Sequence, residues 1–254
     1  MSVLIARGAG VRRSNPRDGD RWLFRDRDVT VEAGDLVAVV GPPASGRTTL
    51  LLALARRFRL AAGTVEIDGR ASLGYVPDVS APESVFTVTE HVRERLALQG
   101  RPRSEAAGVD LHGLDPRKLG QDLSPYERQV LGLTLAELAR PAVIALDDVE
   151  DGLDSREREA LWQLLTEITA RGTAVLITAR EIEPARVTTV INLGDDPSPA
   201  PEAAPVSEVA PVSEPAPVSE VAPVSEVAPA LDATGDEPAA GTATDDASRE
   251  EAQR

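Results

Sequence analysis

Five consecutive apolar residues, Leu36–Val40, lead directly into a loop that has glycines at positions 41 and 46, and the loop leads into a largely apolar segment, residues 47–58. A short unbroken apolar run is typical of a strand buried on both faces of a parallel sheet. A strand, a glycine-containing loop and a helix in this order form the setting that a phosphate-binding loop requires. By itself this pattern also fits a plain tight connection, so two interpretations remain open here.

Apolar strand-like segments alternate with longer helix-like segments as far as residue 193. Buried strands are predicted at residues 36–40, 142–146, 174–178 and 189–193, and helices at 47–58, 89–99, 125–140 and 155–171. This alternation predicts an α/β layered domain, with a parallel core sheet and flanking helices. Alternating apolar and polar residues at 2–7, 28–32 and 63–68 predict an antiparallel β subsheet beside it. Residues 79–122 form a short helical subdomain inserted between two core strands.

The end of the chain has a different composition. Ten of the 20 prolines, 12 acidic residues and two basic residues lie from Pro197 onward, and none of the aromatic residues does. Hexapeptides of the type APVSEV begin at residues 204, 210, 216 and 222. Such a segment cannot bury enough apolar surface to offset its ordering entropy. We therefore predict a folded domain over residues 1–194 and a disordered acidic tail over 195–254, which is either a tether or a docking segment.

Composition also excludes several classes of protein. The chain has no cysteine, so disulfides and thiolate metal sites are excluded. No apolar run approaches the roughly 20 residues that span a bilayer, and the apolar run at residues 3–6 is too short for a signal peptide. The first 196 residues are mildly acidic, which gives no support for nucleic-acid binding. The sequence predicts a cytoplasmic location, either free or peripheral at the inner face of the plasma membrane.

The loop after the first core strand offers a specific set of nucleotide contacts. The candidate residues are Gly41, Ser45, Gly46, Arg47, Thr48 and Thr49. Backbone N–H groups of such a loop and of the following helix attract polyphosphate, and the Thr48 hydroxyl stands where it would ligate Mg²⁺. Arg47 occupies the place of the usual lysine. Its longer, planar guanidinium keeps the charge but does not present a compact ammonium between two phosphates.

Further segments resemble the ATP-binding cassette (ABC) family of P-loop NTPases. Leu123–Gln129, LSPYERQ, opens a predicted helix and is similar to the family signature LSGGQ. Pro141 and Asp147 follow Ser124 by 17 and 23 residues, the spacings of typical members. Gly152–Asp154 resembles the D-loop of the family. The resemblance covers about residues 1–194 and implies ATP and Mg²⁺ as ligands.

The same resemblance assigns roles to single residues. Asp147 matches the aspartate that holds Mg²⁺ through water, and Asp148 matches the glutamate that polarises the attacking water. Asp148 is one methylene shorter, and a misplacement of that order costs about a hundredfold in rate. Arg180 stands at the position of the switch histidine. Asp78 stands at the Q-loop glutamine and is a candidate metal contact, or else a solvated loop acid.

The signature segment departs most from the family pattern. Members place ATP between two cassettes, and the second cassette supplies the signature serine and glycine N–H groups. Ser124 is retained as a candidate nucleotide contact, but Pro125 has no N–H and Tyr126 adds bulk. Each lost hydrogen-bond donor that would face the charge developing in the transition state costs about 10²–10³ in rate.

Two functions follow from the resemblance. One is a slow ATPase that drives or regulates an integral membrane partner through residues 79–122. The alternative is a pseudo-ATPase that acts as a regulatory or assembly module without meaningful hydrolysis. In either case we expect a homodimer or a heterodimer with another cassette, and no nucleic acid as partner. Whether the chain is an enzyme stays open, because most catalytic positions are altered.

Overall fold

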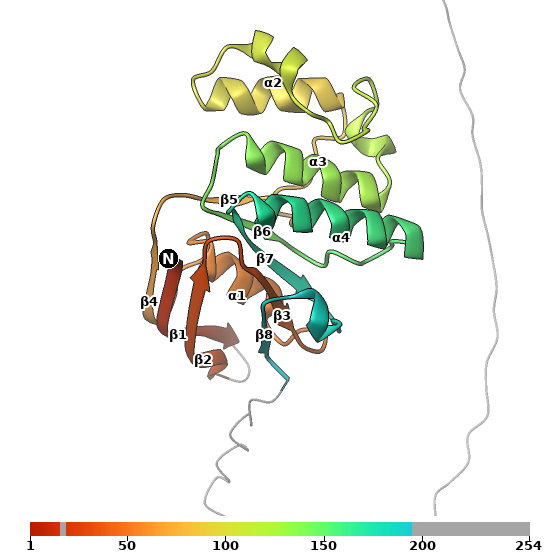
Figure 1. Ribbon diagram of the computed structural model, residues 1–254. Coiled ribbons are helices and arrows are strands. Elements are labelled where there is room, and N and C mark those ends of the chain that lie inside the picture. Colours follow the sequence, from red (N-terminus) through yellow and green to blue (C-terminus); the bar gives the residue numbers. More distant parts are fainter. Residues whose placement is uncertain (16–18, 195–254) are drawn as a thin grey trace, which may run out of the picture. The chain divides into compact units, whose positions relative to one another are not determined.

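A five-stranded parallel sheet lies at the centre of the fold (Figure 1). The computed structural model describes residues 1–15 and 19–194, and the predicted tail, residues 195–254, lies outside the described residues. The strands of this sheet run in the order β5 (Ala71–Leu73), β6 (Val143–Leu146), β7 (Ala174–Ala179), β3 (Leu36–Val40) and β8 (Thr189–Asn192). Four of them were predicted, and β5 was not. The predicted α/β class and the parallel core are confirmed.

The predicted antiparallel subsheet is also present, with longer strands than the sequence indicated. Its order is β2 (Gly19–Glu32), β1 (Ser2–Asn15) and β4 (Ala62–Ile67). The pairing of β1 with β2 is interrupted by register shifts between Ala6 and Arg12, and Gly8 adopts a φ of 56° there. These irregularities hide the two-residue alternation on which the strand prediction depended.

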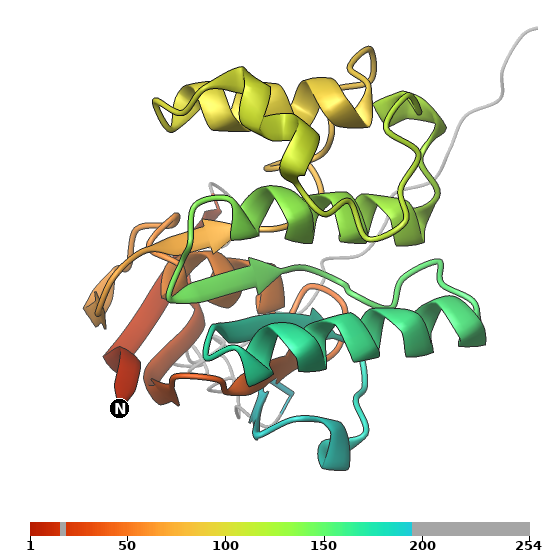
Figure 2. The same cartoon turned by 45° about the horizontal axis from the view of Figure 1, so that its top comes forward.

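Two helices cover one face of the parallel sheet, and the third helix that contacts the sheet covers the other face together with the subsheet. The helices are α1 (Arg47–Leu54), α2 (Val88–Leu98), α3 (Pro125–Glu137) and α4 (Ser155–Ala170). Alternate residues of β3 face the two sides, so Ala38 packs in the cluster with α3 and α4, and Val37 packs with α1 and the subsheet. The helical subdomain, with α2 and the 3₁₀ turn Arg103–Gly108, lies over α3 on the side away from the sheet (Figures 1 and 2).

The helix ends follow from local chemistry. Ser124 caps α3 and Asp154 caps α4, each in a capping box with the glutamate three residues later. Helix α1 ends at Leu54 and not at Phe58 as predicted, because Arg56 adopts a φ of 57° and the N–H groups of residues 57 and 58 both donate to Leu52 O. None of the helices in the described residues has the length and hydropathy that a bilayer crossing requires.

Strand order decides which loops meet. The order β6-β7-β3 makes the carboxyl ends of these three parallel strands neighbours at one edge of the sheet. The loop after β3 contains Gly41–Gly46, β6 is followed by Asp147 and Asp148, and β7 by Arg180. Ligands of open parallel sheets bind at this kind of edge.

Candidate functional site

The phosphate-type loop connects β3 to α1 and is held by a close contact with the subsheet. Gly46 is the N-cap of α1 and has a φ of 96°. A Cβ atom at this position would lie 2.7 Å from Leu23 Cγ of β2. Gly46 is therefore required both by its left-handed backbone and by the packing of Leu23 on the loop.

Two buried polar atoms of the loop have no partner among the described residues. They are Ser45 Oγ and Arg47 Nη1, and the Arg47 residue as a whole is only 9% exposed. A buried polar group without a hydrogen bond costs about 1–3 kcal/mol. A phosphate oxygen would supply the missing acceptor at both atoms. The residues present therefore fit a phosphate ligand.

Thr48 and Asp147, predicted as the metal-binding pair, are in contact. Thr48 Oγ1 donates to Asp147 Oδ2 at 2.8 Å, and Thr178 Oγ1 donates to Asp147 Oδ1. No group of three metal-ligating side chains occurs in the part of the chain that the structure describes. One hydroxyl and one carboxylate suit Mg²⁺ that also takes oxygens from phosphates and water. When bound, Mg²⁺ would neutralise charge on the phosphates.

Asp148 is held by one interaction of its side chain and one of its backbone. Its Oδ1 lies 3.0 Å from Arg47 Nη2, so the cation of the loop and the acid after β6 form an ion pair. Its backbone N–H donates to Thr178 Oγ1 at 2.8 Å, and its φ is 43°, an uncommon value for a residue with a side chain. Burial raises the pKa of Asp148, the Arg47 cation opposes this rise, and Asp147 adds to it. Arg47 and Asp148 both depart from the family pattern and lie 101 positions apart in the sequence, and the structure brings them into direct contact.

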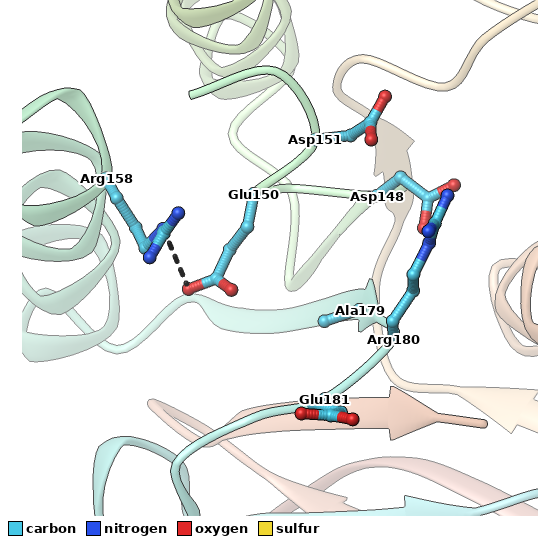
Figure 3. Close-up of a pocket in the computed structure, with 7 residues that line it drawn as sticks. All are labelled: Asp148, Glu150, Asp151, Arg158, Ala179, Arg180 and Glu181. Atoms are coloured by element: carbon cyan, nitrogen blue, oxygen red, sulfur yellow. Dashed lines mark ion pairs between the residues drawn. The ribbon is translucent and has the colours of Figure 1, made fainter. Parts of the chain in front are cut away.

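A cavity of about 340 Å³ opens beside Asp148. Figure 3 shows Arg180 extending from the end of β7 toward the Asp148 carboxylate, with Asp151 on the other side. Arg158 forms an ion pair with Glu150 at 3.8 Å across the same cavity. Arg180 thus lines the cavity beside Asp148, where its charge opposes the rise that burial causes in the pKa of that acid, and its catalytic role stays a prediction.

Thr178 and Gln129 are parts of the site that the sequence analysis missed. Thr178 is fully buried and joins Asp147 to the backbone of Asp148. Gln129 of α3 is 2% exposed, and its Nε2 donates to Asp147 O at 3.1 Å. A polar residue within the apolar strand AVLITA was a visible signal for Thr178. For Gln129, only the contact of α3 with the end of β6 shows its position.

Other predicted residues lie apart from this cluster. The Asp78 side chain is exposed, has a φ of 61° and makes no hydrogen bond or ion pair with another described residue. Ser124 Oγ accepts from Glu127 N at 3.2 Å, so it serves the cap of its own helix. Pro125 is the first residue of α3, where a missing N–H does not weaken the helix. Thr49 lines a second cavity beside the loop.

Comparison with known proteins identifies the family. The family model described as "ABC transporter" matches residues 24–150, half of the chain. A zinc import ATP-binding protein, ZnuC, of Alkalilimnicola ehrlichii is 32% identical over 184 residues, which cover 71% of this chain and 69% of that protein. This chain belongs to the ABC transporter family.

Other members of the ABC transporter family are matched over smaller shares of their length. A putative ABC transporter ATP-binding protein of Bacillus thuringiensis is 31% identical over 63% of this chain and 32% of its own length. The Nod factor export ATP-binding protein I of Burkholderia lata is 30% identical, over 66% of this chain and 61% of that protein. The chain thus spans about a third of the first of these relatives and about three fifths of the second.

Solved structures confirm the P-loop NTPase fold. The ATP-binding cassette MJ0796, in a dimeric post-hydrolysis state bound to ADP and phosphate, matches with a TM-score of 0.66 at 19% identity over 76% of this chain and 94% of that chain. A putative metal-chelate type ABC transporter in an inward-facing conformation matches with a TM-score of 0.62 at 19% identity, over 76% of this chain and 80% of that chain. At 19% sequence identity, these two structures show a shared fold and nothing more specific.

Proposed function

We propose that this chain is a nucleotide-binding subunit that binds Mg-ATP weakly, hydrolyses it slowly at most, and couples to or regulates a transporter-like membrane protein. The observation that carries the proposal is the ion pair between Arg47 Nη2 and Asp148 Oδ1 at 3.0 Å. It joins the cation that would hold phosphate to the acid that would polarise water. Each of the two groups therefore restrains the other.

Weak binding follows from competition for Arg47. A phosphate must take the guanidinium from a carboxylate that already neutralises it. The separated Asp148 carboxylate would then lose its ion-pair partner in a partly desolvated position, which is costly. Ser45 Oγ and Arg47 Nη1 favour phosphate, because both are buried and lack a partner among the described residues. The free energy gained when these two atoms find a phosphate oxygen is opposed by the free energy lost with the ion pair. We therefore expect a modest net affinity for Mg-ATP.

Slow hydrolysis follows from the acid and from the signature segment. The Asp148 carboxylate stops one methylene short of the usual glutamate and points at Arg47. In a pair of cassettes, Ser124 would face the nucleotide of the other chain, but its hydroxyl already caps α3, and Pro125 supplies no N–H. Arg180 is proposed as a cation beside Asp148 in the site, whereas Asp78 is exposed and lies apart from the cluster, so its metal contact stays a prediction.

A membrane partner is proposed from the relatives and from one surface. ZnuC is named as the ATP-binding protein of zinc import, and the Burkholderia lata protein as one of Nod factor export. In this chain the segment 79–122 exposes large apolar side chains at Val79, Val85 and Leu98, which are 53%, 70% and 75% exposed. We propose this segment as the partner contact, at the cytoplasmic face of the membrane, with the chain as a homodimer or a heterodimer and without nucleic acid.

A pseudo-ATPase is the second candidate. It is favoured by the combined observation that Ser124 is engaged as a helix cap and that Arg47 and Asp148 are engaged with each other. In that case the chain would serve assembly or regulation, and nucleotide would bind without turnover.

The test is calorimetric titration of the full chain with Mg-ATP, beside Arg47→Ala. We expect measurable binding in the wild type and a loss of about ten- to a hundredfold in the variant, because a hydrogen bond to a charged group contributes about 1.5–3 kcal/mol. Arg93→Ala, which removes an exposed arginine of α2, is the control and should bind as the wild type does. Equal affinity of the wild type and Arg47→Ala, or no binding at millimolar Mg-ATP, would refute the proposal.

A further inference from the structure

A cavity of about 380 Å³ lies between the helical subdomain and the carboxyl-terminal ends of α3 and α4. It is at the opposite end of α3 from Ser124 and is therefore separate from the site described above. Most of the side chains that line it are charged or titratable. They are those of Arg101, Asp110, His112, Glu137, Arg140 and Arg171. Charges from the subdomain and from the ends of both helices meet here.

His112 lies between two carboxylates of this cavity. Its Nε2 is 3.5 Å from Glu137 Oε2 at the end of α3, and its Nδ1 is 3.7 Å from Asp110 Oδ2 of its own loop. Glu137 also accepts a hydrogen bond from Arg171 Nη2, at the end of α4. Both ring nitrogens donate in a charged histidine, and only one donates in the neutral ring. Only the charged form of His112 can therefore serve both carboxylates.

The groups that face His112 favour this charged form. The hydrogen bond to Glu137 raises the pKa of His112, and the charges of Asp110 and Glu137 add to the rise, against partial burial and the Arg171 cation. Because this pKa is raised in the folded chain, the contact stabilises the fold fully below the unfolded pKa of about 6.5. The stabilisation is lost as pH rises through the higher folded pKa. Arg101, the remaining charged group on the subdomain side, and Arg140, after α3, keep their charge throughout this range.

The loop that carries His112 has little else to hold it. None of the residues 101–113 is buried, and Leu114 is the first that packs into the core cluster. His112 itself has a φ of 50°, an uncommon value for a residue with a side chain. Few buried apolar contacts make a segment prone to local opening. The attachment of this loop therefore depends on the contacts of His112.

A neighbouring contact does not change with pH. Arg101 Nη1, just after α2, donates to Leu138 O at 3.0 Å and joins the end of α2 to the end of α3. Loss of the His112 charge would therefore free the loop 108–113 and leave α2 attached. The chain beyond this loop pairs with the start of α2, since Val88 N–H donates to Lys118 O and Thr89 N–H to Pro116 O.

We propose that His112 is a pH-dependent anchor of the helical subdomain, which fixes the loop 108–113 to Glu137 when charged and releases it when neutral. The loop leads into the residues that support the first turn of α2. The anchor thus controls how firmly the segment 79–122, proposed above as the partner contact, is held. This regulation does not require nucleotide binding, so its test is independent of the proposed function.

The experiment combines two measurements on the full chain. The chain has two histidines, so an NMR titration of the imidazoles follows His91 and His112 separately. We expect the midpoint of His112 to lie above about 6.5, and to fall in Glu137→Gln. Amide exchange, corrected for the intrinsic rate at each pH, should show the protection of residues 108–113 falling at least about threefold as pH rises through this midpoint.

Two substitutions of His112 fix the two states. His112→Gln has no charge, so the loop should exchange quickly at every pH. His112→Arg carries a cation that does not titrate, so protection should persist where the wild type has lost it. Asp122→Asn changes an exposed acid of the same subdomain outside the cavity, and should follow the wild type.

Either of two results would overturn the proposal. A midpoint of His112 at or below about 6.5 would show that the two carboxylates do not hold the charged form. Protection in His112→Gln that falls with pH as it does in the wild type would show that another group controls the loop.

Discussion

Restoring both signature glycines together with the longer acid, in Pro125→Gly/Tyr126→Gly/Asp148→Glu, is expected to raise ATP turnover at least about a hundredfold over the wild-type chain. Glycine at 125 returns an N–H to the first turn of α3, and glycine at 126 removes a ring that is partly buried near Glu157. Glutamate at 148 carries its carboxylate one methylene farther from the backbone than Asp148 does. Turnover is measured as phosphate release at saturating Mg-ATP.

The single variant Asp148→Glu separates the effect of the shorter acid from the effect of the altered signature segment. We expect it to raise turnover by no more than about fivefold, because Pro125 still withholds the N–H that a composite site needs. The capping box of Ser124 and Glu127 remains in the triple variant, and thermal unfolding followed by circular dichroism controls for loss of α3. Full activity from Asp148→Glu alone would show that the signature segment does not limit the rate.

Replacing Asp147 by alanine is expected to abolish the effect of Mg²⁺ on ATP binding. In the wild type, Asp147 is 3% exposed and accepts hydrogen bonds from Thr48 and Thr178. The variant loses the carboxylate and leaves both hydroxyls without this acceptor, so Thr48 is no longer oriented. Groups that orient metal ligands typically contribute about 10–100-fold in metal affinity.

The measurement is ATP titration with Mg²⁺ and with EDTA. We expect a difference of at least about tenfold in the wild type and none in Asp147→Ala. Asp151→Ala removes an exposed acid near Asp148 and serves as the matched control, with the wild-type Mg²⁺ effect. An undiminished Mg²⁺ effect in Asp147→Ala would place the metal elsewhere.

Much of the fold was predictable because buried parallel strands appear as unbroken apolar runs. The run Leu36–Val40 matches β3 residue for residue. Strand β5 has three residues, Ala71–Leu73, too few to give a periodic signal. The end of α1 depends on the left-handed backbone of Arg56, which no glycine announces. Local propensity does not decide such points, and tertiary packing does.

The candidate site, like the fold, was predictable from the sequence only in part. The phosphate-loop pattern and the family resemblance placed Thr48 and Asp147 in one predicted metal site, and the structure brings their side chains within 2.8 Å. The contact between Arg47 and Asp148 was not predictable, because the sequence does not say which way a side chain turns within a site. Treated separately, the two substitutions looked like independent losses. In the structure a longer cation meets a shorter acid, and the two form one ion pair.

The most direct test of this restraint is the affinity of Asp148→Asn for Mg-ATP, measured in the wild-type and in the Arg47→Ala background. We expect asparagine to release Arg47 to the phosphates and to tighten binding about tenfold in the wild-type background, with little gain where Arg47 is absent. Asp151→Asn makes the same change of charge beside the same cavity and should have a much smaller effect. Unchanged affinity of Asp148→Asn, or an equal gain in the Arg47→Ala background, would contradict the claim that Asp148 restrains the phosphate-binding arginine.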